Sequence, residues 1–199
     1  MARTKDKADI RKFEILEHFQ QVLAKEGFEG ASIAKIAKQM GTHPSLLIHY
    51  FSTKEEMIIE LVDFILEKYE SMALQKSREI LNPEQRLNTL LDTIFGVDWI
   101  SLVDSSAFYA CYYLSFRNRK VKERLEKLYK RFKEYLVNEI NLCVSEGLIK
   151  ESDPEKDADF IISLVEGLSF YRNITGGKQK YRELGSYLKE KALQILTKS

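Results

Sequence analysis

The sequence contains few of the residues that interrupt helices or build other kinds of fold. Three prolines, nine glycines and two cysteines occur among its 199 residues. It has no Asn-Gly turn and no sustained alternation of apolar and polar residues, which are the patterns of β-hairpins and strands. Cys111 and Cys143 lie in helical apolar patterns without a Cys-x-x-Cys spacing, so we expect buried thiols rather than a disulfide framework or a zinc site. These absences predict an all-α fold.

Long hydrophobic runs are absent as well. The sequence has no run of apolar residues long enough to span a bilayer, and the amino-terminal segment MARTKDKADIRK is charged. These features predict neither a membrane span nor a signal peptide, and hence a cytoplasmic protein. Hydrophobic residues make up 44% of the chain and charged residues 31%, which is typical of a folded globular protein.

The sequence lacks the motifs of the common catalytic sites. It has no glycine-rich phosphate loop, no His-Glu-x-x-His pair and no nucleophile elbow, and its three histidines are His18, His43 and His49. We therefore expect no enzyme activity, no cofactor and no metal site. Turnover of a bound molecule by the purified protein would contradict this expectation.

The net charge of +1 is unevenly distributed along the chain. Residues 1–54 carry nine Lys and Arg against six Asp and Glu, whereas residues 55–199 carry 22 basic and 24 acidic side chains. The positive amino-terminal part suits an anionic partner. A surplus of three charges is common in small domains, so charge supports such a partner only together with other features.

Hydrophobic periodicity predicts about nine helices. In the first of them, Ile15, Phe19 and Val22 recur at the spacing that gathers side chains on one face. Thr53 and Glu56 form a capping-box pattern at the start of the fourth helix, which is long enough to connect two bodies of structure. The predicted helices span about residues 6–26, 32–39, 44–51, 53–76, 84–95, 105–117, 120–146, 154–174 and 178–197.

Residues 27–56, GFEGASIAKIAKQMGTHPSLLIHYFSTKEE, predict two short helices joined by a tight turn. Ser32 can cap the first helix, and Gly41 supplies the left-handed backbone that a turn between crossed helices requires. Pro44 suits the first turn of the second helix, and Leu47 with Phe51 anchors one of its faces in a core. The rest of its circumference carries groups able to hydrogen-bond to phosphates or base edges, namely His43, Ser45, His49 and Tyr50.

This segment resembles the DNA-binding signature of the tetracycline-repressor (TetR) family of transcription regulators. The resemblance is carried by the joint spacing of Gly27-Phe28, Ser32, Ile36-Ala37, Gly41, Leu47, His49-Tyr50-Phe51 and Lys54-Glu55. The sequence departs from the family pattern at Thr42, Leu46 and Ile48, the last being a position where the family often has tyrosine or histidine.

The TetR resemblance implies a double-stranded DNA partner and a recognition helix at about residues 43–51. The alternative is that His43, His49 and Tyr50 are solvated surface and that His43 only caps its helix. The DNA contacts that the resemblance implies are Ser32, Lys35, Thr42, His43, Ser45, His49, Tyr50 and Lys54.

Residues 55–199 contain most of the aromatic side chains. Aromatic residues at helical spacing are more often core than pocket, but polar tips on apolar walls are also the usual composition of a small-molecule site. In the TetR family the corresponding helices usually enclose an effector cavity. The resemblance therefore implies a small hydrophobic or amphipathic effector bound by Phe95, Trp99, Phe108, Tyr109, Tyr112, Tyr113 and Phe116.

The segment 160–171, FIISLVEGLSFY, is apolar around almost its whole circumference. Its polar residues are Ser163, Glu166 and Ser169, and Gly167 permits close approach of another helix. Such a helix must be covered on two sides, which predicts a subunit interface; the alternative is the centre of a monomeric core. The TetR resemblance implies a homodimer held by the last two helices, with Phe160, Leu164, Gly167, Leu168, Tyr171, Tyr187 and Ile195 in the interface.

The resemblance also predicts how the chain is divided and what it does. Residues 1–54 are expected to form a helix-turn-helix DNA-binding domain, and residues 55–199 a helical ligand-binding and dimerisation domain. The leading hypothesis is a repressor that leaves a near-palindromic operator when a small molecule binds. The alternative keeps the fold and the DNA binding but replaces the effector by a protein partner.

Overall fold

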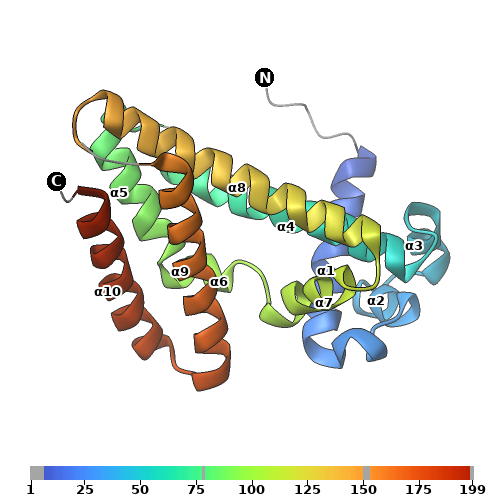
Figure 1. The fold of residues 1–199 in the computed structure, drawn as a ribbon. Helices are drawn as coiled ribbons and strands as arrows, with labels where there is room; N and C mark the ends of the chain where they lie inside the picture. Colours follow the sequence, from blue (N-terminus) through green and yellow to red (C-terminus); the bar gives the residue numbers. More distant parts are fainter. Residues whose placement is uncertain (1–6, 78, 150–152, 198–199) are drawn as a thin grey trace. The chain divides into compact units, whose positions relative to one another are not determined.

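The computed structural model describes residues 7–77, 79–149 and 153–197, and the regular structure in these ranges is entirely helical (Figure 1). The all-α prediction is therefore confirmed. Within the same ranges, no helix combines the length and the apolar character needed to cross a membrane. The described helices are α1 (Lys7–Gly30), α2 (Ile33–Gln39), α3 (Pro44–Tyr50), α4 (Lys54–Ser77), α5 (Pro83–Ile94), α6 (Val97–Ser101), α7 (Ser105–Ser115), α8 (Arg119–Ser145), α9 (Pro154–Thr175) and α10 (Lys178–Thr197).

Capping side chains fix several of the helix starts close to the predicted positions. Each of them accepts a hydrogen bond from a backbone N–H two or three residues ahead, and they are Ser32, His43, Asn82, Asp104 and Asp153. Asp6, where the first helix was predicted to begin, lies outside the described residues. The short helix α6 was not predicted, because five residues are too few for a periodic pattern and Gly96 before it has no capping side chain.

The chain forms two compact units. The first unit comprises Met1–Glu67 and Val103–Leu128, and therefore contains α1, α2, α3, α7 and the first parts of α4 and α8. In this unit α7 packs against α1, although α7 lies after the predicted domain boundary at residue 54. Its core contains Ile15, Phe19, Leu23, Ile36, Leu47, Phe51, Leu61 and Ile65, all almost completely buried.

The second unit comprises Lys68–Leu102 and Tyr129–Ser199, and contains α5, α6, α9, α10 and the later parts of α4 and α8. In this unit α9 and α10 pack side by side, and α10 also contacts α5 and α6. One buried apolar cluster joins these helices and includes Leu87, Leu90, Leu91, Ile94, Leu136, Ile140, Ile161, Val165, Leu168 and Leu196.

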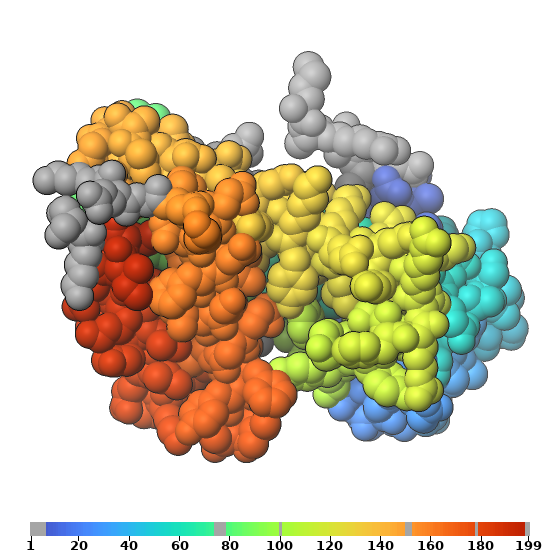
Figure 2. Space-filling model, in the orientation of Figure 1, coloured from blue at the N-terminus to red at the C-terminus, as the bar shows by residue number. Residues whose placement is uncertain are grey.

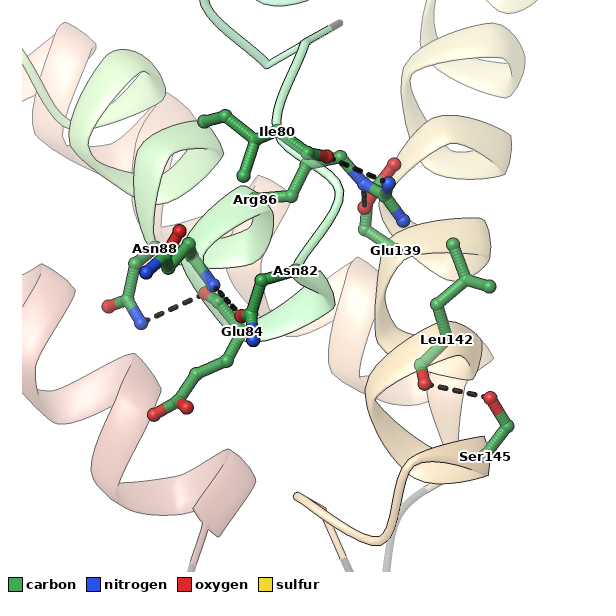
Figure 3. Close-up of polar contacts among 9 residues, drawn as sticks. Ile80, Asn82, Glu84, Arg86, Asn88, Glu139, Leu142 and Ser145 are labelled. Atoms are coloured by element: carbon green, nitrogen blue, oxygen red, sulfur yellow. Dashed lines mark hydrogen bonds and ion pairs between the residues drawn. The ribbon is translucent and has the colours of Figure 1, made fainter.

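A buried ion pair connects α5 to α8 inside the second unit (Figure 3). Arg86 Nε donates a hydrogen bond to Glu139 Oε2 at 2.5 Å, and Arg86 Nη1 donates another to the Ile80 carbonyl oxygen at 3.2 Å. The side chain of Glu139 is 8% exposed and that of Arg86 20%. Both charged groups are largely withdrawn from water, so each needs the opposite charge of the other to offset the free-energy cost of its burial.

Both cysteines are buried thiols, as predicted from their apolar surroundings. Burial raises the pKa of the Cys111 thiol to about 12 and also raises the pKa of Cys143. The neutral thiol is thus the form present in the folded protein at ordinary pH.

We expect both thiols to be inert toward the thiol reagent DTNB while the protein is folded. A thiol with a pKa of about 12 forms roughly a thousandfold less thiolate at mildly alkaline pH than a free cysteine does, and burial also blocks access. The absorbance of released thionitrobenzoate should report both thiols after unfolding in guanidinium. Rapid labelling of folded protein would contradict the placement of Cys111.

Candidate nucleic-acid interface

The turn between α2 and α3 is built on glycine and on two buried anchors. Gly41 has a φ of +62°, a backbone region that residues with a side chain rarely adopt, and the next N–H, that of Thr42, donates to the Ala37 carbonyl oxygen at 2.9 Å. Ile36 in α2 and Leu47 in α3 are completely buried. The two short helices are therefore held on one core with a fixed angle between them, as in a helix-turn-helix.

The face of α3 opposite Leu47 consists mostly of exposed polar groups. Ser45 and His49 are exposed, Tyr50 is half-buried, and the rings of His49 and Tyr50 meet edge to face with centroids 5.1 Å apart. Ile48, on the same side, is 54% exposed. These side chains are available to the edges of bases, because none is buried in the core of the unit.

His43 is exposed and acts as the N-cap of α3. Its Nδ1 accepts a hydrogen bond from the Ser45 backbone N–H at 3.3 Å and lies 2.9 Å from Ser45 Oγ. Thr42, beside it in the turn, is half-buried. His43 therefore caps α3 through Nδ1, and its other ring nitrogen, Nε2, takes no part in the cap.

The predicted backbone-contacting side chains near α2 already have partners in the protein. Ser32 Oγ caps α2 by accepting from the Lys35 N–H at 3.3 Å. Lys35 Nζ forms an ion pair with Glu26 at 2.6 Å, and this hydrogen bond and charge hold the pKa of the Glu26 carboxyl below its usual value. The pair is at the surface, so a phosphate could take the place of Glu26.

Lys54, at the start of α4, is turned toward the protein. Its Nζ donates to the carbonyl oxygens of Phe28 at 2.7 Å and Ala31 at 3.2 Å, and lies 4.2 Å from the centroid of the Phe28 ring. These contacts tie α4 to the chain that follows Gly27, whose φ of 68° bends α1. Lys54 therefore supports the frame of the helix-turn-helix, and a direct phosphate contact would require it to give up a carbonyl.

The predicted capping box at the start of α4 forms in a shifted version. Thr53 Oγ1 accepts from the Glu56 N–H at 3.1 Å, as expected from the sequence. The Glu56 carboxylate accepts from the N–H of Ser52 at 2.8 Å, one residue before the predicted Thr53. The end of α3 and the start of α4 are thus fixed by local hydrogen bonds.

The structure distributes the seven predicted ligand-binding aromatics over both units. Phe95 and Trp99 belong to the second unit and are 3% and 7% exposed. The other five, Phe108, Tyr109, Tyr112, Tyr113 and Phe116, lie in or at the end of α7 in the first unit. Tyr112, Tyr113 and Phe116 are 51%, 47% and 72% exposed, so these three rings form a surface and not a core.

Phe95 lines a cleft of about 260 Å³ between α5, α6 and α10. Charged side chains also line this cleft, and two of them, Asp92 and Lys189, pair with each other at 2.6 Å. Its volume is below the range usual for sites that enclose drug-sized ligands. The cleft fits a small polar molecule better than the predicted hydrophobic or amphipathic effector.

Trp99 lies in a cluster of aromatic and polar side chains inside the second unit. The Trp99 ring lies 4.4 Å from that of Tyr69 and 5.5 Å from that of Phe132, measured between centroids. Burial raises the pKa of Tyr69 and of Tyr181, and the charge of Glu166 of α9 adds a smaller increase to each. Glu166 accepts a hydrogen bond from the Tyr129 hydroxyl. These four polar residues were not among the predicted site residues, although Glu166 was noted as a polar residue in an apolar helix.

The outer face of α9 and α10 carries much of the predicted dimer interface. The two helices lie side by side at the surface in the space-filling view (Figure 2). Tyr171, Tyr187 and Ile195 are about half exposed, Gly167 is exposed, and Phe160 and Leu164 are half-buried. Leu168 was predicted to lie in the interface, but its side chain is 2% exposed. It lies in the core of its own unit, near Gly185 of α10.

The geometry of α2, the turn and α3 defines a helix-turn-helix protein of the DNA-binding type. Comparison with known proteins gives its family. The profile of the bacterial regulatory proteins of the tetR family matches residues 15–61, and that of the tetracyclin repressor-like C-terminal domain matches residues 82–198, more than half of the chain. The chain belongs to the TetR family of DNA-binding transcriptional regulators, as its sequence resemblance indicated.

Individual relatives are distant. The HTH-type transcriptional regulator BetI of Rhizobium meliloti is 24% identical over 160 residues, which cover 80% of this chain and 76% of BetI. The regulator PksA of Bacillus subtilis is 24% identical over 162 residues, covering 81% and 78%.

Solved structures share the fold at lower identity. A TetR transcription regulator from Haloarcula marismortui superposes with a TM-score of 0.85 at 18% identity, covering 95% of this chain and 99% of its own. A transcriptional regulator from Saccharomonospora viridis, solved in complex with choline, gives a TM-score of 0.82 at 16% identity and covers 96% and 99%.

Proposed function

We propose that this regulator is a dimeric repressor that leaves a near-palindromic operator when a small molecule binds its second unit. The observation that carries the proposal is the outer face of α3, where Ser45 and His49 are exposed on a helix whose Leu47 is completely buried. A firmly anchored short helix with outward hydrogen-bonding groups suits a major groove. His43, Tyr50 and Thr42 lie beside this face, and we propose that they extend the contact.

The backbone of the DNA would be held by the residues around α2 and α4. Ser32 and Lys35 lie at the start of α2, where Lys35 can exchange its exposed partner Glu26 for a phosphate. For Lys54 we propose an indirect part in this contact, because its ammonium holds the backbone at Phe28 and Ala31.

Dimerisation is supported by large apolar side chains exposed on α9 and α10. Phe170, Ile174, Tyr187 and Ile195 are 57%, 69%, 54% and 47% exposed on two neighbouring helices. An apolar surface of this kind is stabilised by a second copy, and two-fold symmetry would then present two recognition helices to two half-sites.

The effector part of the proposal is supported by the aromatic and polar cluster around Trp99 in the second unit. A structural relative was solved with choline, which supports a small molecule as the ligand of this fold. Binding would favour one arrangement of the dimer over another and so lower the affinity for DNA by the difference in ligand affinity.

A protein partner in place of an effector is favoured by one observation, the exposed aromatic end of α7. Tyr112, Tyr113 and Phe116 together present an apolar surface that a partner could cover. A regulator that binds its operator but responds to no small molecule would favour this second candidate.

Replacing His49 by alanine should lower operator affinity by roughly tenfold to a hundredfold without affecting folding. His49 is exposed, so its removal costs base contacts and not core packing. Binding to DNA from upstream of the protein's own gene, measured by fluorescence anisotropy at several salt concentrations, would report the change. The loss should exceed that for nonspecific DNA.

His18→Ala is the matched control, because His18 belongs to α1 and not to α3, and its ring contacts Gln39. We expect it to keep the operator affinity within about twofold. If the unaltered dimer failed to bind the DNA upstream of its gene at low salt, that result would contradict the proposed function itself.

A further inference from the structure

The cleft between α5, α6 and α10 is lined by an arginine that pairs with none of the residues that the structure describes. The charged lining residues are Asp92 of α5, Asp98 of α6, and Arg182 and Lys189 of α10. Lys189 Nζ pairs with Asp92 at 2.6 Å, and Asp98 also has an interaction partner. Arg182 is exposed and, within the described ranges, forms no ion pair or side-chain hydrogen bond. Its guanidinium donors are therefore available to an anion.

A second hydrogen-bonding group of the cleft lies on the same side of α10. Ser186 comes four residues after Arg182 and three before Lys189, so the three side chains share one face of the helix. Hydroxyls such as those of Ser163 and Thr197 donate to the carbonyl oxygen four residues earlier, at 2.7 and 2.8 Å. In the described part of the chain Ser186 makes no such bond, although it lines the cleft. The face thus carries a row of hydrogen-bond donors.

A contact between two backbones fixes this row of donors against the end of α5. A Cβ on Gly185, the residue before Ser186, would lie 2.5 Å from the Phe95 carbonyl oxygen. Gly185 and Phe95 both line the cleft. Because α10 is already held at this point, binding of a ligand need not order the helix, which favours affinity.

The cleft also has an apolar part and a limited size. Phe95 and Val97 line it, and Phe95 is 3% exposed while Val97 is half-buried. The volume of about 260 Å³ is below the range of sites that enclose drug-sized ligands. These features suit a small molecule with one anionic group and a short apolar body.

The proposed dimer interface uses a different side of α10. Tyr187, one of its residues, comes two positions before Lys189. Two residues turn an α-helix by about 200°, so these side chains leave α10 in nearly opposite directions. A second copy on the proposed interface would therefore leave the row of donors accessible.

We propose that this cleft binds a small carboxylic acid in its ionised form. Arg182 is the main contact of the carboxylate, because a planar guanidinium can donate two parallel hydrogen bonds to its oxygens. Ser186 adds a third donor, and the Lys189 ammonium, which has three N–H groups, serves both the ligand and Asp92. That the acid is the effector rests on the proposed repressor function, whereas its binding can be measured on the protein alone.

The test compares carboxylic acids with their uncharged amides. Butyrate and benzoate are titrated beside butyramide and benzamide at constant ionic strength, and calorimetric heat follows the binding. We expect at least one acid to bind about tenfold more tightly than its amide, since charge-assisted hydrogen bonds are stronger than neutral ones. Inorganic phosphate, titrated in the same way, should bind more weakly than that acid because it lacks an apolar body.

Two substitutions in the cleft should change acid binding in opposite directions. Arg182→Gln should weaken it about tenfold and leave amide binding unchanged. Asp92→Asn should strengthen it about threefold, because the change removes the carboxylate that competes for Lys189. The Asp92 side chain is 66% exposed, so its replacement leaves the core intact.

Lys191→Gln is the matched control, because it removes one positive charge from the same helix outside the cleft. Lys191 is exposed, and its Nζ donates to Gln194 Oε1 at 3.0 Å. We expect this variant to keep the affinity for the acid within about twofold, since salt screens a distant exposed charge. An equal loss in Lys191→Gln and Arg182→Gln would show general attraction by charge and would overturn the site.

Three further outcomes would overturn the proposal. These are acids that bind no better than their amides, unchanged acid binding in Arg182→Gln, and tighter binding of phosphate than of either acid. Each of them would leave the repressor function in place if the protein still bound its operator. Failure of operator binding together with intact acid binding would instead contradict the proposed function and support the cleft.

Discussion

Replacing Arg86 by methionine should lower the free energy of unfolding by about 3 kcal/mol, the low end of the range for breaking a buried ion pair. The substitution leaves Glu139, whose side chain is 8% exposed, without its cation, and it also removes the hydrogen bond to the Ile80 carbonyl oxygen (Figure 3). The loss is large because an unpaired buried carboxylate must either stay charged in a poor environment or take up a proton. Guanidinium denaturation at a fixed protein concentration measures it.

The double variant Arg86→Met with Glu139→Leu separates charge from packing. With both charges gone, most of the lost stability should return, since apolar pairs can replace buried ion pairs at little cost. The Ile80 carbonyl oxygen remains without its donor, so recovery should be incomplete. The matched control is Lys130→Met, which breaks an exposed pair with Glu134 and should change stability by less than about 1 kcal/mol. A double variant as unstable as Arg86→Met would contradict this account.

Gly185→Ala should destabilise the second unit by about 2 kcal/mol and disturb the position of α10. A Cβ at this position would lie 2.5 Å from the Phe95 carbonyl oxygen, a backbone atom that cannot rotate away. Overpacking of this kind costs about 3 kcal/mol, whereas alanine gains about 1 kcal/mol over glycine inside a helix. The clash is the larger of the two contributions, so the net effect on the free energy of unfolding is destabilising. Thermal unfolding measures the loss, and sedimentation velocity measures its effect on self-association.

Gly167 provides the contrasting helical glycine. A Cβ there meets nothing within 4 Å in the single chain, so Gly167→Ala should not destabilise the folded protomer and can gain up to about 1 kcal/mol of helix stability. If α9 packs closely against a second copy, as we propose, a bulkier Gly167→Gln should weaken the dimer while the protomer stays folded. Equal dimer strength in Gly167→Gln and the unaltered protein would place the interface elsewhere.

The helix-turn-helix was predictable because its signals are local. Ser32, Gly41 and Pro44 act on the backbone within a few residues of themselves, and the structure uses each of them at the predicted position. Periodicity likewise located the long helices. These features need no knowledge of which segments meet in space.

Tertiary partners account for what the sequence did not reveal. An amphipathic pattern says that Leu168 is buried but not by what, and the structure buries it within its own unit. The sequence shows that Lys54 carries a positive charge, but only the structure shows that its ammonium donates hydrogen bonds to two backbone carbonyl oxygens. Trp99 and Phe132 come together from segments that are far apart along the chain, so no local pattern could have joined them.

The histidine cap of α3 has a chemical consequence for what the regulator can read. The tautomer in which Nδ1 accepts the Ser45 N–H is the one that carries the ring proton on Nε2. The group that His43 offers outward is therefore a hydrogen-bond donor. In a major groove such a donor is matched by the acceptors N7 and O6 of guanine, N7 of adenine and O4 of thymine, or by a phosphate oxygen, while the amino groups of adenine and cytosine repel it. In the proposed complex with DNA, this backbone cap would restrict the bases that can face the start of α3.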